Sequence, residues 1–363
     1  MHVPYRNLTI RGQSERSGLI EDLESLLDSG QFMMGNAVRR FERDFANYTE
    51  RRGAVGVANG TSALYLSLRA LGIGPGDEVV TTSMSWLATA NAIIITGAKP
   101  VFVDVDDDLN ICPEAVEAAI TPFTRAILVV HFCGRVCAVD ELSALAEVHG
   151  IALIEDASQA AGASFQERKA GYWGCAAAFS LNAMKPLGAL GEAGIVVSDK
   201  QELLEKVLSL RYLGTRNIEI CDDPELNHKM DEIQALWLSR RLELLESVLA
   251  ERRKMATRLA SLFPHEMRVI GIEEPTRTTF FEFTIEVDDR DRLKEYLEER
   301  GIDSRVKHPI LMCDQIGYGV SPRPEVPNAR RLIDRILSLP LHAGLTEDQI
   351  AHMIRSLEKF SAI

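Results

Sequence analysis

Residues 126–156 read AILVVHFCGRVCAVDELSALAEVHGIALIED. The first six residues are an apolar, largely β-branched run that predicts a buried strand. Residues 139–149 have the spacing of an amphipathic helix, and Gly150 supplies the glycine that often follows a helix end. Residues 151–156 predict a second strand, which closes on two carboxylates. A strand, a helix and a strand in this order predict two parallel strands joined by a crossover helix.

The same alternation continues on both sides of this segment. Apolar strands that alternate with helices indicate a mostly parallel sheet covered on both faces, with ligands bound at the carboxyl ends of its strands. The fold class is therefore α/β. Further strands are expected over residues 54–58, 78–82, 100–104, 177–180 and 194–198, and helices over 61–71, 85–96, 113–120 and 202–212.

The pattern changes after residue 232. One long helix is expected over residues 233–259, followed by a strand, a helix, a proline-containing irregular stretch and a final helix. This order predicts a smaller C-terminal α+β domain. We expect a large domain with an N-terminal arm over residues 1–245 and a small domain over residues 246–363. The later elements are expected at 280–287, 292–300 and 347–359, with the irregular stretch around Pro309, Pro322, Pro324 and Pro327.

Composition narrows the class of protein. The 363 residues include 53 Asp and Glu against 40 Lys and Arg, a net charge of −13, which argues against a nucleic-acid partner. The chain is long enough to bury a large core without disulfides. Residues 79–98 carry no charge, but their many Ser, Thr and Asn residues favour a buried strand and helix over a membrane span. The N-terminus lacks a signal-peptide pattern, and we expect a cytoplasmic protein with no membrane partner.

Six scattered cysteines do not form the pattern of a secreted disulfide framework. Cys133 and Cys137 lie close to His131, which raises the possibility of a zinc site. Because no second Cys/His pair follows at structural-zinc spacing, we expect buried free thiols and no metal.

Three short segments carry residues that are candidates for binding or catalysis. Residues 59–64, with Gly60, Thr61 and Ser62, lie where a strand meets a helix, and this junction is either a phosphate cradle or a plain N-cap. Asp156 ends a buried strand, where a carboxylate needs a cation or several hydrogen-bond donors. A capped turn would supply the donors, and an ion pair would supply the cation. Lys185 is the only charge between residues 169 and 192, so it is either a desolvated nucleophile or a surface lysine.

Five motifs occur in order along the chain. They are NGTSAL at 59–64, GPGDEV at 74–79, EDASQAAG at 155–162, the segment from Phe179-Ser180 through Lys185 to GEAG at 191–194, and LPLH at 339–342. Together they resemble the pyridoxal-phosphate-dependent sugar aminotransferases of the DegT/StrS type, from about Leu23 to the C-terminus. The resemblance implies an aspartate-aminotransferase-like architecture of PLP fold type I.

The resemblance implies roles for four residues around a pyridoxal 5'-phosphate ring. Lys185 is expected to hold the cofactor as a Schiff base and to move a proton between the substrate and the cofactor. Asp156 is expected to pair with the pyridine nitrogen, so that the ring acts as an electron sink. Gln159 would contact the ring's 3-oxygen. Trp86 would stack on the ring face, although a core or interface tryptophan is the alternative.

The resemblance also implies a phosphate site and a partner subunit. Gly60, Thr61, Ser62 and Ser180 would hold the phosphate. Asn227 would reach it from the other subunit of a homodimer with shared active sites. Two departures from the family pattern are the His-Lys pair that follows Asn227, where an aromatic and an Arg are usual, and Ala193, where a glycine is usual.

The implied activity is a ping-pong transfer of an amino group from an amino acid, with L-glutamate as the expected donor, to a nucleotide-linked keto-sugar. An unlinked ketocyclitol is the alternative acceptor. A sugar dehydratase and a non-catalytic regulator are alternatives of another class. The dehydratase relatives carry His at the lysine position, so Lys185 argues against that activity. Substrate contacts are expected among Arg211, Arg216, Lys229 and His308, each of which could equally be a surface charge, and acceptor choice is assigned to loops 33–36 and 310–327.

Overall fold

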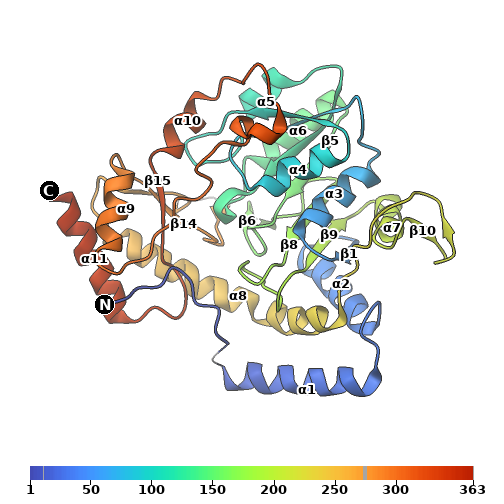
Figure 1. Ribbon diagram of the computed structural model, residues 1–363, viewed down its shortest axis with the longest axis horizontal. Helices are drawn as coiled ribbons and strands as arrows, with labels where there is room; N and C mark the ends of the chain where they lie inside the picture. Colours follow the sequence, from blue (N-terminus) through green and yellow to red (C-terminus); the bar gives the residue numbers. More distant parts are fainter. Residues whose placement is uncertain (11, 273–275, 363) are drawn as a thin grey trace.

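The computed structural model describes residues 1–10, 12–272 and 276–362. Its centre is a seven-stranded sheet in the order β1-β9-β8-β5-β4-β2-β3 (Figure 1). β9 pairs antiparallel with both β8 and β1, and the other pairings in the sheet are parallel. The predicted α/β class and the mostly parallel sheet are therefore confirmed.

The elements have the following bounds. The strands of the central sheet are β1 (Gly53–Val57), β2 (Glu78–Thr82), β3 (Lys99–Val103), β4 (Thr124–Val130), β5 (Ala152–Asp156), β8 (Ala176–Ser180) and β9 (Gly194–Ser198). The helices are α1 (Gln13–Ser29), α2 (Asn36–Tyr48), α3 (Gly60–Ala70), α4 (Leu87–Ile95), α5 (Pro113–Ala119), α6 (Val139–His149), α7 (Gln201–Leu210), α8 (Glu232–Ala260), α9 (Arg290–Glu298), α10 (Pro327–Ile333) and α11 (Glu347–Ser361). The remaining strands are β6 (Ser164–Phe165), β7 (Arg168–Lys169), β10 (Thr215–Arg216), β11 (Ile220–Cys221), β12 (Arg268–Val269), β13 (Thr276–Arg277), β14 (Phe283–Glu286) and β15 (Ile336–Leu339).

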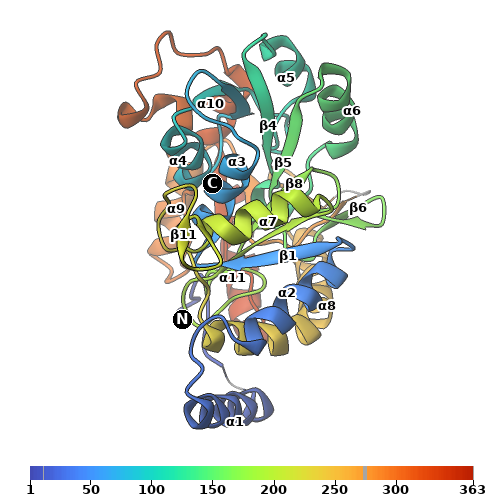
Figure 2. The same cartoon turned by 90° about the vertical axis from the view of Figure 1, so that its right-hand side faces the viewer.

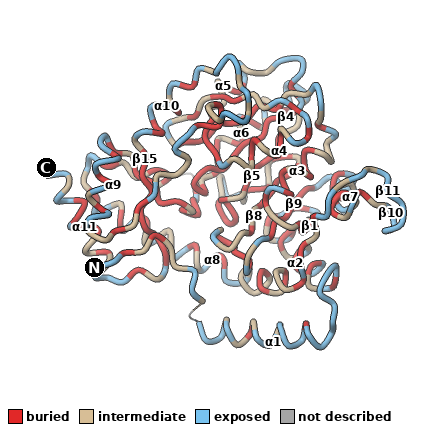
Figure 3. Tube along the Cα trace, viewed as in Figure 1, coloured by how far each residue is buried: buried red, intermediate tan, exposed pale blue. Residues whose placement is uncertain are grey.

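Both faces of the central sheet are buried, which explains why its strands read as continuous apolar runs. The central core covers both faces of this sheet, and alternate residues of one strand enter opposite layers of it. Val80 and Ile127 pack with α2, α5, α6 and α8, whereas Val79 and Leu128 pack with α3, α4 and α7. Figure 2 shows α2 and α7 on opposite sides of β1. Figure 3 shows the resulting concentration of buried residues in the sheet.

The second core lies around a small sheet in the order β12-β14-β15. α8 joins the two cores: Leu245 and Leu249 pack with the central sheet, whereas Ala256 and Leu259 pack with the small one. Val3 also belongs to the second core. A division near residue 245 therefore falls inside a continuous helix, just before its packing changes, and we keep that division as a proposal.

Several elements were not predicted. α1 lies at the edge of the molecule, away from the central sheet, and is mostly exposed (Figures 1 and 3). The other missed helices are α2, which buries Phe41 and Phe45, and α10, which begins at Pro327 within the stretch that the sequence indicated as irregular. The strand β15, which packs in the second core, was also missed, because four residues are too few for a clear period-2 pattern.

No helix in the part of the chain that the structure describes is long and apolar enough to cross a membrane. The six cysteines are free thiols, as predicted. They are not uniformly buried, because Cys221 is exposed and Cys112 and Cys175 are half-buried. Across residues 1–10, 12–272 and 276–362, no group of three His, Cys, Asp or Glu residues could hold a metal ion.

Candidate active site

The site is assembled at the carboxyl ends of neighbouring strands. β5 ends at Asp156 and β8 at Ser180, and the two strands are paired in the sheet. β1 leads through Asn59 into α3, which begins at Gly60. Three of the sequence motifs, far apart along the chain, therefore meet at one edge of the sheet, as expected for parallel strands.

The start of α3 has the features of a phosphate cradle as well as those of an N-cap. The Asn59 side chain accepts a hydrogen bond from the backbone N–H of Ser62 at 2.8 Å. A Cβ on Gly60 would lie 2.5 Å from Ser180 Cβ, so only glycine allows this approach of α3 to β8. The Ser62 hydroxyl lies 2.9 Å from His228 Nδ1, and Thr61 is exposed.

Asp156 is 3% exposed and is held by neutral donors. Its Oδ2 accepts a hydrogen bond from the Thr89 hydroxyl at 2.8 Å, and its Oδ1 accepts one from the backbone N–H of Ser158 at 3.1 Å. Of the two alternatives raised from the sequence, the structure shows the capped turn, and no ion pair to Asp156 is found among the described residues.

Gln159 has a defined orientation. Its Oε1 accepts a hydrogen bond from the backbone N–H of Cys133 at 2.8 Å, and the hydroxyl of Thr279 donates to its backbone carbonyl, also at 2.8 Å. Because the amide oxygen is engaged, Nε2 is the group that Gln159 can offer to a ligand as a donor.

Lys185 lies in the loop that follows β8 and is half-buried. Burial lowers the pKa of its amine from 10.5 to about 8. The carboxylates of Asp156 and Glu282 act against this lowering, and the cations of Arg6 and Lys307 add to it. The sequence had left a surface lysine and a desolvated nucleophile open, and the structure favours the nucleophile.

A charged cluster next to Lys185 was not predicted. Glu282, which is 4% exposed, accepts hydrogen bonds from the hydroxyl of Tyr5 and from Arg6 Nη2. Lys307 Nζ lies 3.3 Å from Glu282 Oε1. Because these residues come from the N-terminal arm and from two segments of the second core, no local sequence pattern could have revealed the cluster.

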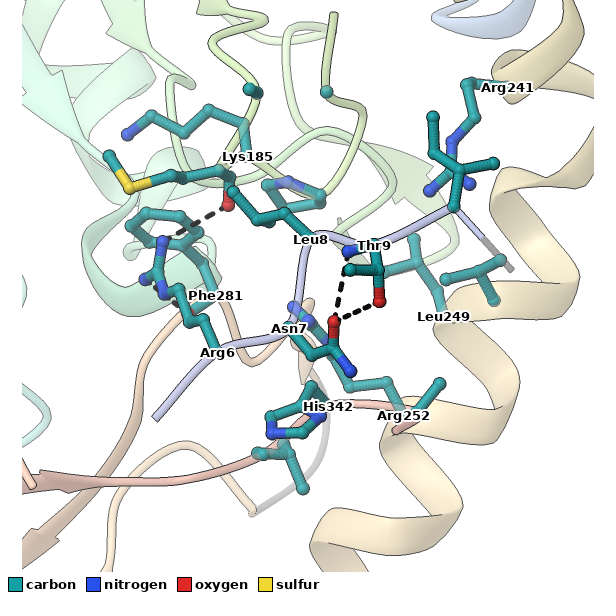
Figure 4. Close-up of a pocket in the computed structure, with 18 of the residues that line it drawn as sticks. Arg6, Asn7, Leu8, Thr9, Lys185, Arg241, Leu249, Arg252, Phe281 and His342 are labelled. Carbon is teal, nitrogen blue, oxygen red and sulfur yellow. Dashed lines mark hydrogen bonds between the residues drawn. The ribbon is translucent and has the colours of Figure 1, made fainter. Parts of the chain in front are cut away.

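The loop that carries Lys185 also borders a cavity of about 470 Å³ between the N-terminal arm and α8. Figure 4 shows Arg6 and Phe281 beside Lys185 at one end of this cavity and Arg241 and Arg252 toward α8. Lys185 Nζ lies 4.3 Å from the centre of the Phe281 ring. Of the predicted site residues, Lys185 is the one that lines this cavity, so the cavity adjoins the candidate site without containing it.

Trp86 precedes α4 and is 61% exposed, so it is not a core tryptophan. Its ring contacts that of His308 edge to face at 5.7 Å between centres. Burial lowers the pKa of His308 to about 4. His308 is thus placed as a neutral ring beside Trp86.

The other candidate substrate residues are dispersed. Arg211 is buried and donates to Glu42 at 2.6 Å, so it forms an ion pair inside the protein. Arg216 forms a two-bond ion pair with an acidic residue in the exposed β10–β11 hairpin. Asn227 is exposed, and Lys229 Nζ lies 3.8 Å from the centre of a tyrosine ring.

Glu155 has a structural role beside the site. Its buried carboxylate accepts hydrogen bonds from His131 Nε2 at 2.9 Å and from the backbone N–H groups of Gly171, Trp173 and Gly174 at 2.6–2.8 Å. Burial alone would raise the pKa of this carboxyl, but the hydrogen bonds outweigh it and hold the pKa below its usual value. His131 Nε2 is therefore engaged by the Glu155 carboxylate.

Known proteins resemble the chain over nearly its whole length. The model of the DegT/DnrJ/EryC1/StrS aminotransferase family matches residues 13–358. A protein of Geobacillus stearothermophilus named "Pleiotropic regulatory protein" is 34% identical, and 99% of each chain is covered. A "dTDP-3-amino-3,4,6-trideoxy-alpha-D-glucose transaminase" of Streptomyces venezuelae is 36% identical, over 99% of this chain and 96% of that one. The crystal structure of NtdA from Bacillus subtilis with bound cofactor PMP superposes with a TM-score of 0.93 at 26% identity, covering 100% of this chain and 86% of that one.

Proposed function

This chain belongs to the DegT/DnrJ/EryC1/StrS aminotransferase family, and on that premise we propose that it uses pyridoxal 5'-phosphate to move an amino group from L-glutamate to a nucleotide-linked keto-sugar. One observation carries the proposal. The amine of Lys185 has a pKa of about 8, and the buried Asp156 carboxylate, which has no ion-pair partner among the described residues, is close enough to influence it.

The donor set fits the cofactor. A pyridinium nitrogen is a suitable partner for a buried carboxylate that only neutral groups hold. Gln159 Nε2 is available for the ring's 3-oxygen, because the backbone N–H of Cys133 occupies Oε1. The close contact between Gly60 and Ser180 brings the first N–H groups of α3 next to the end of β8, where they suit a phosphate.

We assign the following roles to the chain's own residues. The bound cofactor supplies the electron sink that the transfer needs. Lys185 attaches the cofactor and carries protons at its Nζ, which its lowered pKa allows near neutral pH. Asp156 holds the ring nitrogen, and Gln159 orients the ring. Trp86 covers one ring face, which its exposed indole permits.

The acceptor is proposed to be a nucleotide-linked sugar, since a relative that matches nearly the full length carries the name of a dTDP-sugar transaminase. An unlinked ketocyclitol remains the alternative acceptor. A regulatory role is the alternative of another class, because a relative of the same length is named as a regulatory protein. The presence of Lys185 and its lowered pKa favour the enzyme.

We also propose a cytoplasmic homodimer in which each site is completed by the partner. Asn227 is exposed, and the next residue, His228, lies against Ser62 of its own chain. The 227–229 segment is therefore at the edge of the phosphate cradle, in a position to face a second copy. This arrangement supports a contribution of Asn227 to the partner's phosphate site.

The activity is tested with the purified protein and its visible absorption spectrum. We expect a band from bound pyridoxal phosphate, loss of that band on addition of L-glutamate, and release of 2-oxoglutarate. Lys185→Ala should not turn over, whereas Lys254→Ala, a change at an exposed lysine of α8, should behave like the parent. A bound cofactor that responds to no amino acid would favour the regulator and refute the enzyme.

Shared active sites are tested by mixing two inactive variants. If Asn227 serves the partner, unfolding and refolding Lys185→Ala together with Asn227→Ala should restore part of the activity, because some mixed dimers contain one intact site. A monomer in solution, or a mixture as inactive as its components, would refute the shared site.

A further inference from the structure

Asp156 is connected to α4 by a short chain of hydroxyl groups. The Thr89 hydroxyl lies 2.8 Å from Asp156 Oδ2, and the Ser85 hydroxyl lies 2.9 Å from Thr89 Oγ1. Ser85 is 4% exposed and Thr89 is 1% exposed, so water does not compete for these bonds. The bond between Thr89 and Asp156 joins residues that are 67 positions apart in the chain.

The direction of the bonds follows from the chemistry of the groups. An ionised carboxylate can only accept, so the single hydroxyl proton of Thr89 is donated to Asp156. Thr89 Oγ1 must then accept from Ser85, whose proton completes the chain. All three groups are satisfied only when the chain runs from Ser85 through Thr89 to Asp156.

The Thr89 hydroxyl is not occupied by its own helix. Hydroxyls in helices commonly bond the carbonyl four residues back, as the buried Ser67 does to Ala63 and the half-buried Ser239 does to Ala235. Thr89 meets the side chain of Ser85 four residues back and donates to the sheet instead.

We propose that Thr89 is a positioning residue, supported by Ser85, that sets the orientation of the Asp156 carboxylate toward the ring nitrogen of the cofactor. The inference rests on the proposed function. The backbone N–H of Ser158 holds only Oδ1, so without Thr89 the other oxygen can turn away. Trp86 lies at the same helix start, so one turn of α4 positions both the acid and the ring-stacking side chain.

The test compares the natural cofactor with its 1-deaza analogue, in which a carbon replaces the ring nitrogen. Thr89→Val removes the hydroxyl and keeps the shape, and should weaken pyridoxal phosphate binding about tenfold, as expected for losing a hydrogen bond to a charged group. The affinity for the analogue should not change, since the analogue has no nitrogen for Asp156 to hold. Thr89→Ser should bind pyridoxal phosphate within about twofold of the parent, and the affinity of Ser85→Ala should lie between those of Thr89→Val and Thr89→Ser.

Thr81→Val is the matched control. Thr81 is fully buried and its hydroxyl also makes a 2.8 Å bond, but to the backbone carbonyl of Leu128. It should lose stability as Thr89→Val does and keep its affinity for the natural cofactor. Binding is measured by titration of the cofactor-free full chain, and catalysis is not needed.

Three results would overturn the inference: Thr89→Val binds the natural cofactor as tightly as the parent, it loses the same factor for the analogue, or Thr89→Ser is as weak as Thr89→Val. If Thr89→Val does not fold, Ser85→Ala decides by the same comparison of the two ligands. A parent protein that binds no pyridoxal phosphate would overturn the proposed function and this inference with it. Normal binding by the parent together with any of the three results overturns the inference alone.

Discussion

The lowered pKa of Lys185 makes a quantitative prediction about how fast the cofactor-free protein captures pyridoxal phosphate. Only the uncharged amine attacks an aldehyde. At pH 7 a pKa of about 8 leaves roughly one amine in ten uncharged, whereas the ordinary value of 10.5 would leave roughly three in ten thousand. Burial therefore makes Lys185 roughly 300 times more available at neutral pH than an exposed lysine.

The rate of capture is followed from the visible band at a series of pH values. We expect the rate to rise with pH and to reach half its plateau near pH 8. Lys185→Ala measures the slow reaction of the other lysines and is subtracted. In Asp156→Asn the midpoint should move lower, because the Asp156 carboxylate raises the pKa of Lys185 and the amide does not.

Two outcomes would refute this reasoning. A midpoint at pH 10 or above would mean that the fold does not desolvate the amine. A midpoint that rises in Asp156→Asn would mean that the carboxylate does not act on Lys185 as the structure indicates.

Three further predictions concern the packing around the site. Gly60→Ala should weaken phosphate binding and lower the free energy of unfolding by about 1–3 kcal/mol, because its Cβ would meet Ser180 Cβ at 2.5 Å. Gly74→Ala, with no atom nearer than 3.6 Å, should change neither, and equal effects of the two in a cofactor titration would contradict the steric account. Glu155→Ala should lower the free energy of unfolding by about 3–5 kcal/mol in a denaturant titration, since it leaves His131 and three backbone N–H groups without their acceptor, and a loss below about 1 kcal/mol would show that water replaces the carboxylate. The folded protein holds the pKa of Glu155 below the ordinary 4.5, so the stability that this carboxylate contributes is present above pH 4.5 and is lost as the pH falls through the lower folded value. Glu155→Gln should therefore lose less stability in acid than the parent. An unchanged dependence of the free energy of unfolding on pH would argue against the shift.

Much of the central sheet could be predicted from local sequence. β2, β9 and α6 begin and end at the predicted residues, because a strand buried on both faces is a continuous apolar run and α6 has a glycine at its end. The predictions failed for α1, which is mostly exposed, and for short strands such as β15. Such elements are stabilised by their neighbours, and their own residues carry too little periodicity to show it.

The candidate site divides in the same way. The Lys185 and Asp156 motifs could be identified from their residue types and order. What Asp156 touches could not, because the hydroxyl of Thr89 reaches it from a different helix. The same holds for Glu282, whose partners Tyr5 and Arg6 lie more than 270 positions away.

The sequence alone determined the strands of the central sheet, most of the helices that cover it, and the amine and acid beside the carboxyl ends of its strands, because periodic burial and motif order are local properties of the chain. Only the tertiary structure decided the environment of those two groups. The pKa of Lys185 depends on burial and on charges from four other segments, and the orientation of Asp156 depends on a hydroxyl 67 positions away. Both properties depend on residues that are distant in the sequence and that only folding brings together.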